Sequence, residues 1–187
     1  MLFPHTESRH VTLRPAAVAD APLVYGVLLR LGHAGLPMLD TFVDQFGRGR
    51  SACFLVYRRD QPGPGGEPAG DERLIGFSAL SDLAPAGHLR AEVSLVEGQP
   101  DEVVTEAHAL TTNFAFAMWR TRKVYFHTVD PAPSAIGFGA DRSAMVRAEA
   151  VLPGHTFFHG RLWDVHVLAV YREEWDTVGA DLLKQLV

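Results

Sequence analysis

The sequence predicts a single α/β domain over residues 1–187, in which helices cover both faces of a seven-stranded mixed sheet. Two patterns predict it. A run of strands joined by short connections fills the first half of the chain, and a strand–helix–strand unit follows it. The chain is 47% hydrophobic, so a domain of this length can bury a full core.

One strand and two helices are expected at the beginning of the chain. Residues 11–14 alternate apolar and polar side chains and stop at Pro15, as a short strand does. From residue 21 to 31 apolar side chains recur at helical spacing, and glycines follow. A second helix with one apolar face is expected over residues 37–46.

Three strands are expected next, over residues 51–58, 74–81 and 88–96. The segment between the first two, residues 60–72, is rich in Pro and Gly and has no apolar anchor. We therefore interpret it as a mobile hairpin loop that is dispensable for folding, because such a segment can neither pack nor pair.

The helical period returns over residues 103–120, and a strand follows over 123–129. A crossover of this length joins parallel strands, so the strands near 88–97 and 123–129 are predicted to be parallel neighbours.

The last third of the chain begins with an irregular segment. Prolines interrupt residues 130–147, where a short helix is expected within 134–147. Two strands, 149–159 and 162–171, and a terminal helix over 172–187 complete the predicted sheet and its cover.

Charge and composition narrow the classes of partner. The formal net charge is −5, which argues against nucleic acids and anionic membranes as partners. No apolar run has the length of a membrane span, and the N-terminus lacks the features of a signal peptide, so a cytoplasmic protein is predicted. The single cysteine, Cys53, lies in an apolar strand and is interpreted as a small buried hydrophobe, not a nucleophile.

Four stretches resemble the GNAT superfamily of N-acyltransferases, and its RimJ/RimL-like branch most closely. They are residues 11–21, 74–77, 105–116 and 160–175. The resemblance spans nearly the whole chain and implies the GNAT fold. It also implies transfer of an acyl group from a thioester, acetyl-CoA or another acyl donor, to an amine.

The cofactor loop departs from the family pattern. In the family, a loop of the form Q/R-x-x-G-x-G/A cradles the CoA pyrophosphate with backbone N–H groups and a helix N-terminus. Here the corresponding residues are 99–104: Gln99 fits, Pro100 has no N–H, and Glu102 and Val104 replace the small residues. We therefore interpret the loop as degenerate.

The negative charges at this loop disfavour binding of the CoA pyrophosphate, which is a polyanion. Each carboxylate of Asp101 and Glu102 near a phosphate charge costs about 1–4 kcal/mol, whereas the helix terminus contributes about 0.3–1 kcal/mol. Weak acetyl-CoA binding is expected. Both residues are also favourable in the first turn of a helix, which explains why the sequence tolerates them.

The resemblance also implies site residues. Cofactor contacts are expected from the fourth strand and from the loop with the helix after it: Val93, Leu95, Gln99, Val103, Val104 and Thr105. Glu92 is the candidate general base, on the same side of its strand as Arg90 and Ser94. Ser134 is the candidate second catalytic residue, with 141–143 as a displaced equivalent.

Other polar residues have two interpretations. Tyr125 and Tyr171 are either proton donors or packing tyrosines. Asp164 has either a structural role or a role in a site wall. Three histidines of the predicted last hairpin, His155, His159 and His166, invite a metal hypothesis, but no metal-binding spacing supports it and no metal is expected.

Two functions are compatible with these residues. The first is an N-acyltransferase whose donor is acetyl-CoA, another acyl thioester or an acyl carrier protein, and whose acceptor is a small-molecule or peptide amine. The second is a non-catalytic GNAT-fold module that keeps the scaffold as a binding or regulatory surface. A homodimer is possible in either case.

Overall fold

The computed structural model describes residues 3–33, 35–59, 72–158 and 160–187. Of the predicted loop 60–72, all but Glu72 lies outside the described residues. Glu72 itself is anchored, because its carboxylate accepts a hydrogen bond from Thr12 Oγ1 at 3.2 Å and is paired with Arg14.

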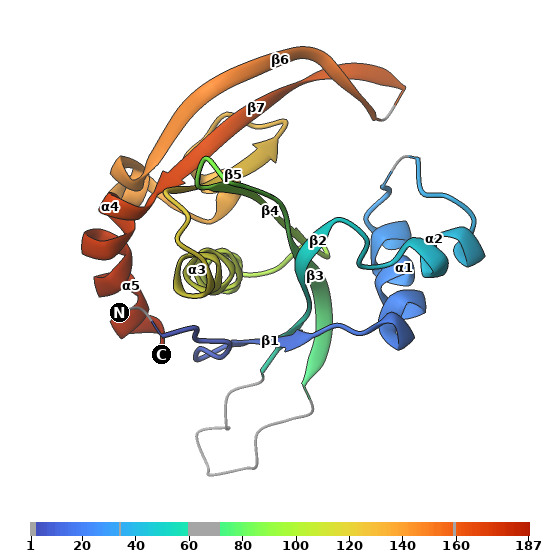
Figure 1. Ribbon diagram of the computed structural model, residues 1–187, viewed down its shortest axis with the longest axis horizontal. Coiled ribbons are helices and arrows are strands. Elements are labelled where there is room, and N and C mark those ends of the chain that lie inside the picture. The colour runs from blue at the N-terminus through green and yellow to red at the C-terminus, as the bar shows by residue number, and fades with distance from the viewer. Residues whose placement is uncertain (1–2, 34, 60–71, 159) are drawn as a thin grey trace.

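A seven-stranded sheet of order β1-β2-β3-β4-β5-β7-β6 forms the centre of the molecule (Figure 1). The β4 and β5 strands are parallel, as predicted, and every other neighbouring pair in the sheet is antiparallel. The strands are β1 (Val11–Pro15), β2 (Arg50–Arg58), β3 (Arg73–Ala84), β4 (His88–Leu95), β5 (Lys123–Thr128), β6 (Val146–Phe158) and β7 (Arg161–Tyr171).

The helices follow the predicted order with three differences. The main helix begins two residues early, at Asp101; two 3-10 turns replace the helix expected within 134–147; and a π-helical turn interrupts the terminal helix. The α-helices are α1 (Ala21–Arg30), α2 (Leu39–Gln45), α3 (Asp101–Met118), α4 (Arg172–Glu174) and α5 (Ala180–Leu186), and the other turns are η1 (Val18–Asp20), η2 (Pro133–Ile136), η3 (Ala140–Met145) and η4 (Trp175–Gly179).

Two layers of helix cover the two faces of the sheet. The sheet curves around α3, with α4 and α5 beside it, while α1 and α2 form an arm on the opposite face (Figure 1). The alternation of β2 explains this arrangement: Phe54 and Val56 pack with α3, and Leu55 packs with α1 and α2. Buried Leu110 anchors α3, and its truncation to Ala should cost about 2–5 kcal/mol.

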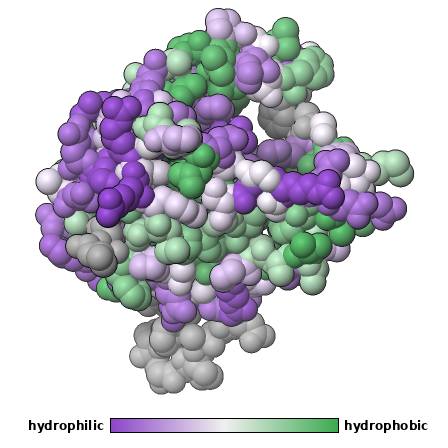
Figure 2. Space-filling model, in the orientation of Figure 1, coloured by the Kyte–Doolittle hydropathy of each residue, from purple (hydrophilic) through white to green (hydrophobic). Residues whose placement is uncertain are grey.

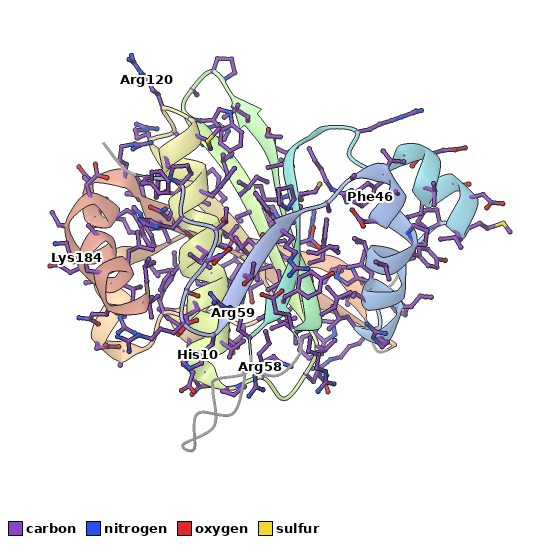
Figure 3. All side chains as sticks on the ribbon, turned by 90° about the horizontal axis from the view of Figure 1, so that it is seen from below. His10, Phe46, Arg58, Arg59, Arg120 and Lys184 are labelled. Atoms are coloured by element: carbon purple, nitrogen blue, oxygen red, sulfur yellow. The ribbon has the colours of Figure 1, made fainter. Side chains whose placement is uncertain are left out.

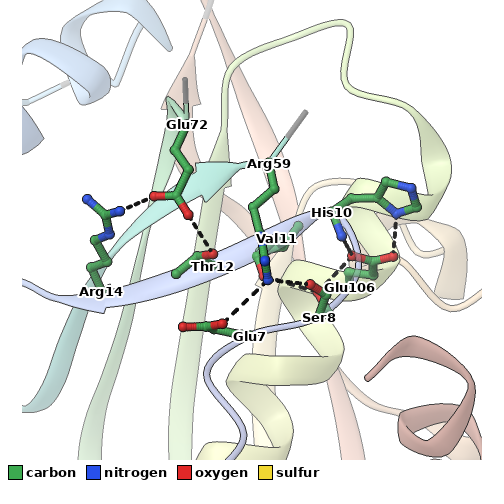
Figure 4. A network of polar contacts seen from close by, with 9 residues as sticks. All are labelled: Glu7, Ser8, His10, Val11, Thr12, Arg14, Arg59, Glu72 and Glu106. Atoms are coloured by element: carbon green, nitrogen blue, oxygen red, sulfur yellow. Dashed lines mark hydrogen bonds and ion pairs between the residues drawn. The ribbon is translucent and has the colours of Figure 1, made fainter. Parts of the chain in front are cut away.

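The segment before β1 is held to α3 by a buried carboxylate (Figure 4). Glu106, 1% exposed, accepts hydrogen bonds from Ser8 Oγ at 2.7 Å, from His10 N at 2.8 Å and from His10 Nδ1 at 2.7 Å. Burying a carboxylate is costly unless donors surround it. These three donors therefore fix the N-terminal segment, and the cluster has a structural role.

The β6–β7 hairpin supports the structural interpretation of Asp164. Its Oδ1 accepts a hydrogen bond from the backbone N–H of Gly154 at 2.8 Å. Gly154 has a φ of 55° and lies where the register of β6 shifts between Leu152 and Thr156. Asp164 therefore stabilises an irregular stretch of the hairpin.

Candidate functional site

The parallel strands β4 and β5 diverge after a short region of pairing. Their pairing covers His88 to Ala91 on β4 and Lys123 to Phe126 on β5. Beyond Ala91, β4 continues to Leu95, and β3 is its only partner among the described strands. The divergence opens one edge of β4 in the middle of the sheet.

A cavity of about 330 Å³ lies at this divergence, and we call it the splay cavity. Its lining includes Glu92, Val93 and Ser94 from β4, Phe126 and His127 from β5, and His108 from α3. Its volume is within the range of small-molecule sites.

Glu92 points to the same side of β4 as Arg90 and Ser94, as the sequence predicts. The Ser94 hydroxyl donates a hydrogen bond to Glu92 Oε1 at 3.2 Å. His33 Nε2 lies 3.9 Å from the same oxygen, and the Glu92 side chain is 34% exposed. The carboxylate is therefore held in position while remaining open to a ligand.

A second cavity of about 670 Å³ lies between the α1–α2 arm and the sheet, and we call it the arm cavity. Figure 2 shows the molecule hollowed between the arm and the β6–β7 hairpin, and Figure 3 shows Phe46 where the arm meets the sheet. Both cavities are lined by His33, Arg90 and Glu92. Glu92 therefore stands where the two cavities meet.

His108 is a site residue that sequence reasoning missed. Its imidazole is buried, and Nδ1 lies 2.8 Å from the carbonyl oxygen of Val104. A carbonyl can only accept, so Nδ1 carries the proton and Nε2 has a free lone pair. Burial lowers the pKa of His108 to about 4, although the hydrogen bond to Val104 acts to raise it. A neutral imidazole therefore lines the splay cavity.

His127 is a second such residue. Burial lowers the pKa of His127, electrostatic interactions with Arg90 and His155 lower it further, and Asp82 acts in the opposite direction. The signal for both histidines in the sequence is weak, because a lone histidine in an apolar helix or strand is most often part of the core or the surface.

The helix start corrects the predicted boundary of the cofactor loop. Only two residues of the 99–104 stretch, Gln99 and Pro100, precede α3. The Pro100 carbonyl accepts hydrogen bonds from the N–H groups of Val103 at 3.0 Å and Val104 at 3.1 Å. The backbone N–H groups of Asp101 and Glu102 are thus the ones in the first turn that have no acceptor within the helix.

A third cavity, of about 400 Å³, lies at this helix start, and we call it the α3 cavity. The residues lining it include Asp101, Glu102, Thr105, Ser134 and Arg142. Arg142 lies 3.6 Å from the Asp141 carboxylate. The resemblance to the GNAT superfamily did not predict a cation at this cavity. Arg142 reduces the net negative charge that a phosphate would meet.

The irregular segment after β5 is clamped to α3. Thr105 Oγ1 donates to the Gly137 carbonyl at 2.6 Å. Gly137 has a φ of 75°, and a Cβ there would lie 2.9 Å from the Thr105 Cα. Only glycine allows this approach. The clamp places Ser134 in the α3 cavity, whereas Glu92 lines the splay and arm cavities. The two candidate catalytic residues line different cavities.

The six residues predicted to contact the cofactor do not all line the same cavity. Val93 lines the splay cavity, and Val104 and Thr105 line the α3 cavity. The Val103 side chain is 1% exposed and belongs to the core. Leu95 packs beside the same core cluster, and Gln99 Nε2 donates to the Val96 carbonyl at 3.2 Å.

The two candidate tyrosines belong to a separate cluster. The hydroxyls of Tyr125 and Tyr171 both donate to Glu149, the former at 2.9 Å. Lys123 Nζ lies 2.7 Å from the same carboxylate. Neither tyrosine lines the splay cavity. The single cysteine, Cys53, is half-buried, and burial raises the pKa of its thiol, which disfavours a nucleophile.

The histidines of the last hairpin do not converge in the described part of the chain. Val151, not His155, is opposite His166, and His159 lies outside the described residues. No group of three or more histidine, cysteine, aspartate or glutamate side chains there could hold a metal ion. Within the same residues, no helix is long and apolar enough to cross a membrane.

Comparisons with solved structures identify the fold as that of GNAT acetyltransferases. A mutant of the spermidine/spermine N-acetyltransferase SpeG from Vibrio cholerae matches with a TM-score of 0.70 and 14% identity, over 90% of this chain and 97% of that one. SpeG in complex with CoA and spermine matches with a TM-score of 0.66 and 14% identity, over 89% and 98% of the two chains.

A probable GNAT-family acetyltransferase from Chromobacterium violaceum matches with a TM-score of 0.63 and 16% identity, over 92% of this chain and 88% of that one. No protein-family model matches the sequence. A search of curated proteins finds no significant match. The structural neighbours thus confirm the predicted fold class.

Proposed function

We propose that the protein is an N-acyltransferase that moves an acyl group from a thioester to an amine. One observation carries the proposal: Glu92 stands at the junction of the splay cavity and the arm cavity. A thioester in the first cavity and an amine in the second would meet beside a carboxylate. The structural neighbours, a spermidine/spermine N-acetyltransferase and a probable GNAT-family acetyltransferase, support the same reaction class.

The reaction requires two proton movements. Glu92 accepts a proton from the acceptor ammonium, directly or through a water, and the free amine attacks the thioester carbonyl carbon. The new C–N bond forms as the C–S bond breaks. The nitrogen then passes its second proton, directly or through a water, to the leaving thiolate, which becomes a thiol. Ser134 lines the α3 cavity, and the next two residues, Ala135 and Ile136, line the splay cavity, so Ser134 remains our candidate for a role near the leaving group.

The open edge of β4 supports binding of the donor. Between Glu92 and Leu95 the backbone has no β5 partner, so its polar groups can pair with an extended, amide-bearing arm as in strand addition. Val93 would flank that arm. A pantetheine arm, whether of CoA or of an acyl carrier protein, has this chemistry.

The α3 cavity fits the CoA pyrophosphate poorly. The side chains of Asp101 and Glu102 are exposed there, and Arg142 offers one cation against them. This supports a donor that binds mainly through its acyl and pantetheine parts. It also favours a second candidate function, a non-catalytic GNAT-fold module that has lost acetyl-CoA binding.

Product analysis distinguishes the two candidates. The protein is incubated with a mixture of amines and, separately, acetyl-CoA, longer acyl-CoAs and acyl-pantetheine, and acylated amines are detected by mass spectrometry. We expect acylated amine above the rate without protein with at least one donor, and loss of it in Glu92→Gln. If no donor yields product and calorimetry detects no donor binding, the non-catalytic function is correct.

A further inference from the structure

The arm cavity has arginines on β2 and β4, the two strands that flank β3. In the β2–β3 register Arg50 is opposite Ser81, and in the β3–β4 register Ser81 is opposite Arg90. The two arginine Cα atoms are therefore about 10 Å apart on one face of the sheet. Arg48, two residues before Arg50, lines the same cavity.

Two of these arginines have no acid beside them. Within the described residues, no carboxylate lies within ion-pair distance of Arg48 or Arg50. The Arg50 guanidinium lies 5.9 Å from the centroid of the Phe46 ring and 5.6 Å from that of Phe77. The rings orient the guanidinium without neutralising it. Its charge is thus available to a ligand.

Arg90 is positioned by an acid on an irregular strand end. The β3–β4 register shifts between Ser81 and Ala84, and Asp82 within this bulge has a φ of 56°. The bulge turns the Asp82 carboxylate towards Arg90, with Oδ2 at 3.4 Å from Nε. Contact through Nε leaves the two terminal nitrogens for a planar oxyanion.

The charges of the cavity match a single carboxylate. The lining of the cavity includes the guanidinium groups of three arginines and the carboxylates of Asp82 and Glu92, which leaves one net positive charge. Glu92, the proposed base, lies two residues from Arg90 on the same face, about 7 Å along the strand. An amine at Glu92 would thus place an attached anion near the arginines.

We infer that the acceptor is a small amine that carries a carboxylate, bound by Arg48, Arg50 and Arg90 while its amine faces Glu92. The inference rests on the proposed function and specifies its substrate class. A polyamine, as bound by SpeG, would instead place a second cation against these arginines, where like charges repel.

Matched acceptors test the inference. Thiol release from one acyl thioester is measured with ω-amino acids of two to six carbons, and with the alkylamine and diamine of each length. At the best length we expect kcat/KM for the amino acid to exceed that for the alkylamine by about tenfold or more, as a charged hydrogen bond provides. Equal or faster reaction of alkylamines or diamines at every length overturns the inference and leaves acyl transfer intact.

Charge reversal gives a second readout that does not depend on loss of activity. Arg50→Glu should reverse the preference, so that diamines react faster than amino acids. Arg120→Gln is the matched control, since Arg120 projects from the end of the molecule away from the arm (Figure 3). An unchanged preference in Arg50→Glu contradicts the inference.

Binding separates the inference from the proposed function. Calorimetric titration with the same ω-amino acids and alkylamines needs no turnover. Selective binding of the amino acids that Arg50→Gln abolishes supports the anion site, even if no thiol release is found and acyl transfer is refuted. Indistinguishable titrations for amino acids and alkylamines overturn the inference, whatever the catalytic result.

Discussion

His108 combines a buried ring with a polar cavity wall. Burial is the main cause of its low pKa, so the folded state keeps the imidazole neutral and its Nε2 lone pair free. In an acyltransferase His108 would line the cavity that holds the donor. The same burial has a consequence for stability that is measurable without any substrate.

The stability of the protein should fall in acid because of His108. The unfolded chain takes up a proton near pH 6.5, whereas the folded state does so only near pH 4. The free energy of unfolding should therefore be unaffected by this group above about pH 6.5 and decrease by about 3 kcal/mol as the pH falls to about 4. Urea unfolding between pH 4 and 7 measures this slope.

The His108→Gln variant should lose that part of the slope, and His5→Gln, near the N-terminus, should keep it. A wild-type slope identical to that of His108→Gln would show that the imidazole is not held neutral.

Arg90 should control the titration of His127. Arg90 is one of the charges that lower the pKa of His127, and Asp82 acts in the opposite direction. Arg90→Gln should therefore raise the pKa of His127, as followed by NMR of the imidazole ring protons. Arg120→Gln should leave it unchanged. A pKa that stays the same or falls in Arg90→Gln would place Arg90 away from the splay cavity.

At the scale of elements, a bulge in β6 connects three strands. The β6–β7 register shifts between Ala148 and Ala150, and the extra residue is Glu149. Burial would raise the pKa of Glu149, but hydrogen bonds from Lys123, Tyr171 and Tyr125 lower it. Burial likewise acts to lower the pKa of Lys123, and its contacts with Glu149 and Tyr125 raise it. The pair thus joins β6 to β5 across β7.

Glu149→Gln should destabilise this part of the sheet. The change leaves the ammonium of Lys123, whose side chain is 11% exposed, without its carboxylate. We expect a loss of about 1–2 kcal/mol and a decrease in Tm of roughly 2–8 °C. Glu173→Gln, at an exposed carboxylate, is the control. No change in Tm for Glu149→Gln would mean that the pair contributes nothing.

We propose that the start of α3 limits CoA binding. Glu102→Gly together with Pro100→Gly removes one carboxylate and adds one N–H donor. Together these two changes should strengthen the binding of acetyl-CoA by about 2–4 kcal/mol, which lowers its Kd by roughly 30- to 1000-fold. The lower end is expected, because both glycines add flexibility at the helix start. Calorimetric titration at matched salt measures it.

Glu97→Gly, in the turn before α3, is the control for this experiment. Low-micromolar binding by the wild type would contradict the interpretation of a degenerate loop. Weak binding by both proteins would instead identify the 130–147 segment as the part that closes the site.

The presence of helices and strands could be predicted from the sequence better than the residues at which they begin and end. Periodicity identified α3, but its first turn was ambiguous, because Asp101 and Glu102 suit both a loop and a helix start. Prolines at 131 and 133 indicated an irregular segment, but the short helix expected within 134–147 was wrong, because two 3-10 turns form there. The row of Arg50 and Arg90 depends on strand register, and a bulge that shifts register leaves no periodic signal.

At the scale of the whole molecule, the mixed sheet and one of its strand pairings followed from the sequence. The crossover length of α3 predicted the parallel pair that defines this sheet, and the structure confirms it. The divergence of that pair was not predictable from residue patterns, because it depends on where pairing stops. Only the resemblance to the GNAT superfamily pointed to Glu92. His108 lines the splay cavity because of how α3 packs against the sheet, which residue patterns do not indicate.

Thiol release tests the central claim most directly. Wild type, Glu92→Gln and Glu97→Gln are assayed with acetyl-CoA, longer acyl-CoAs and acyl-pantetheine, each with and without an amine acceptor. We predict amine-dependent release by the wild type and by Glu97→Gln, and a rate lower by about 10²–10⁴-fold in Glu92→Gln, with unchanged Tm. Release that does not depend on the amine, or equal rates in Glu92→Gln and the wild type, would contradict the account.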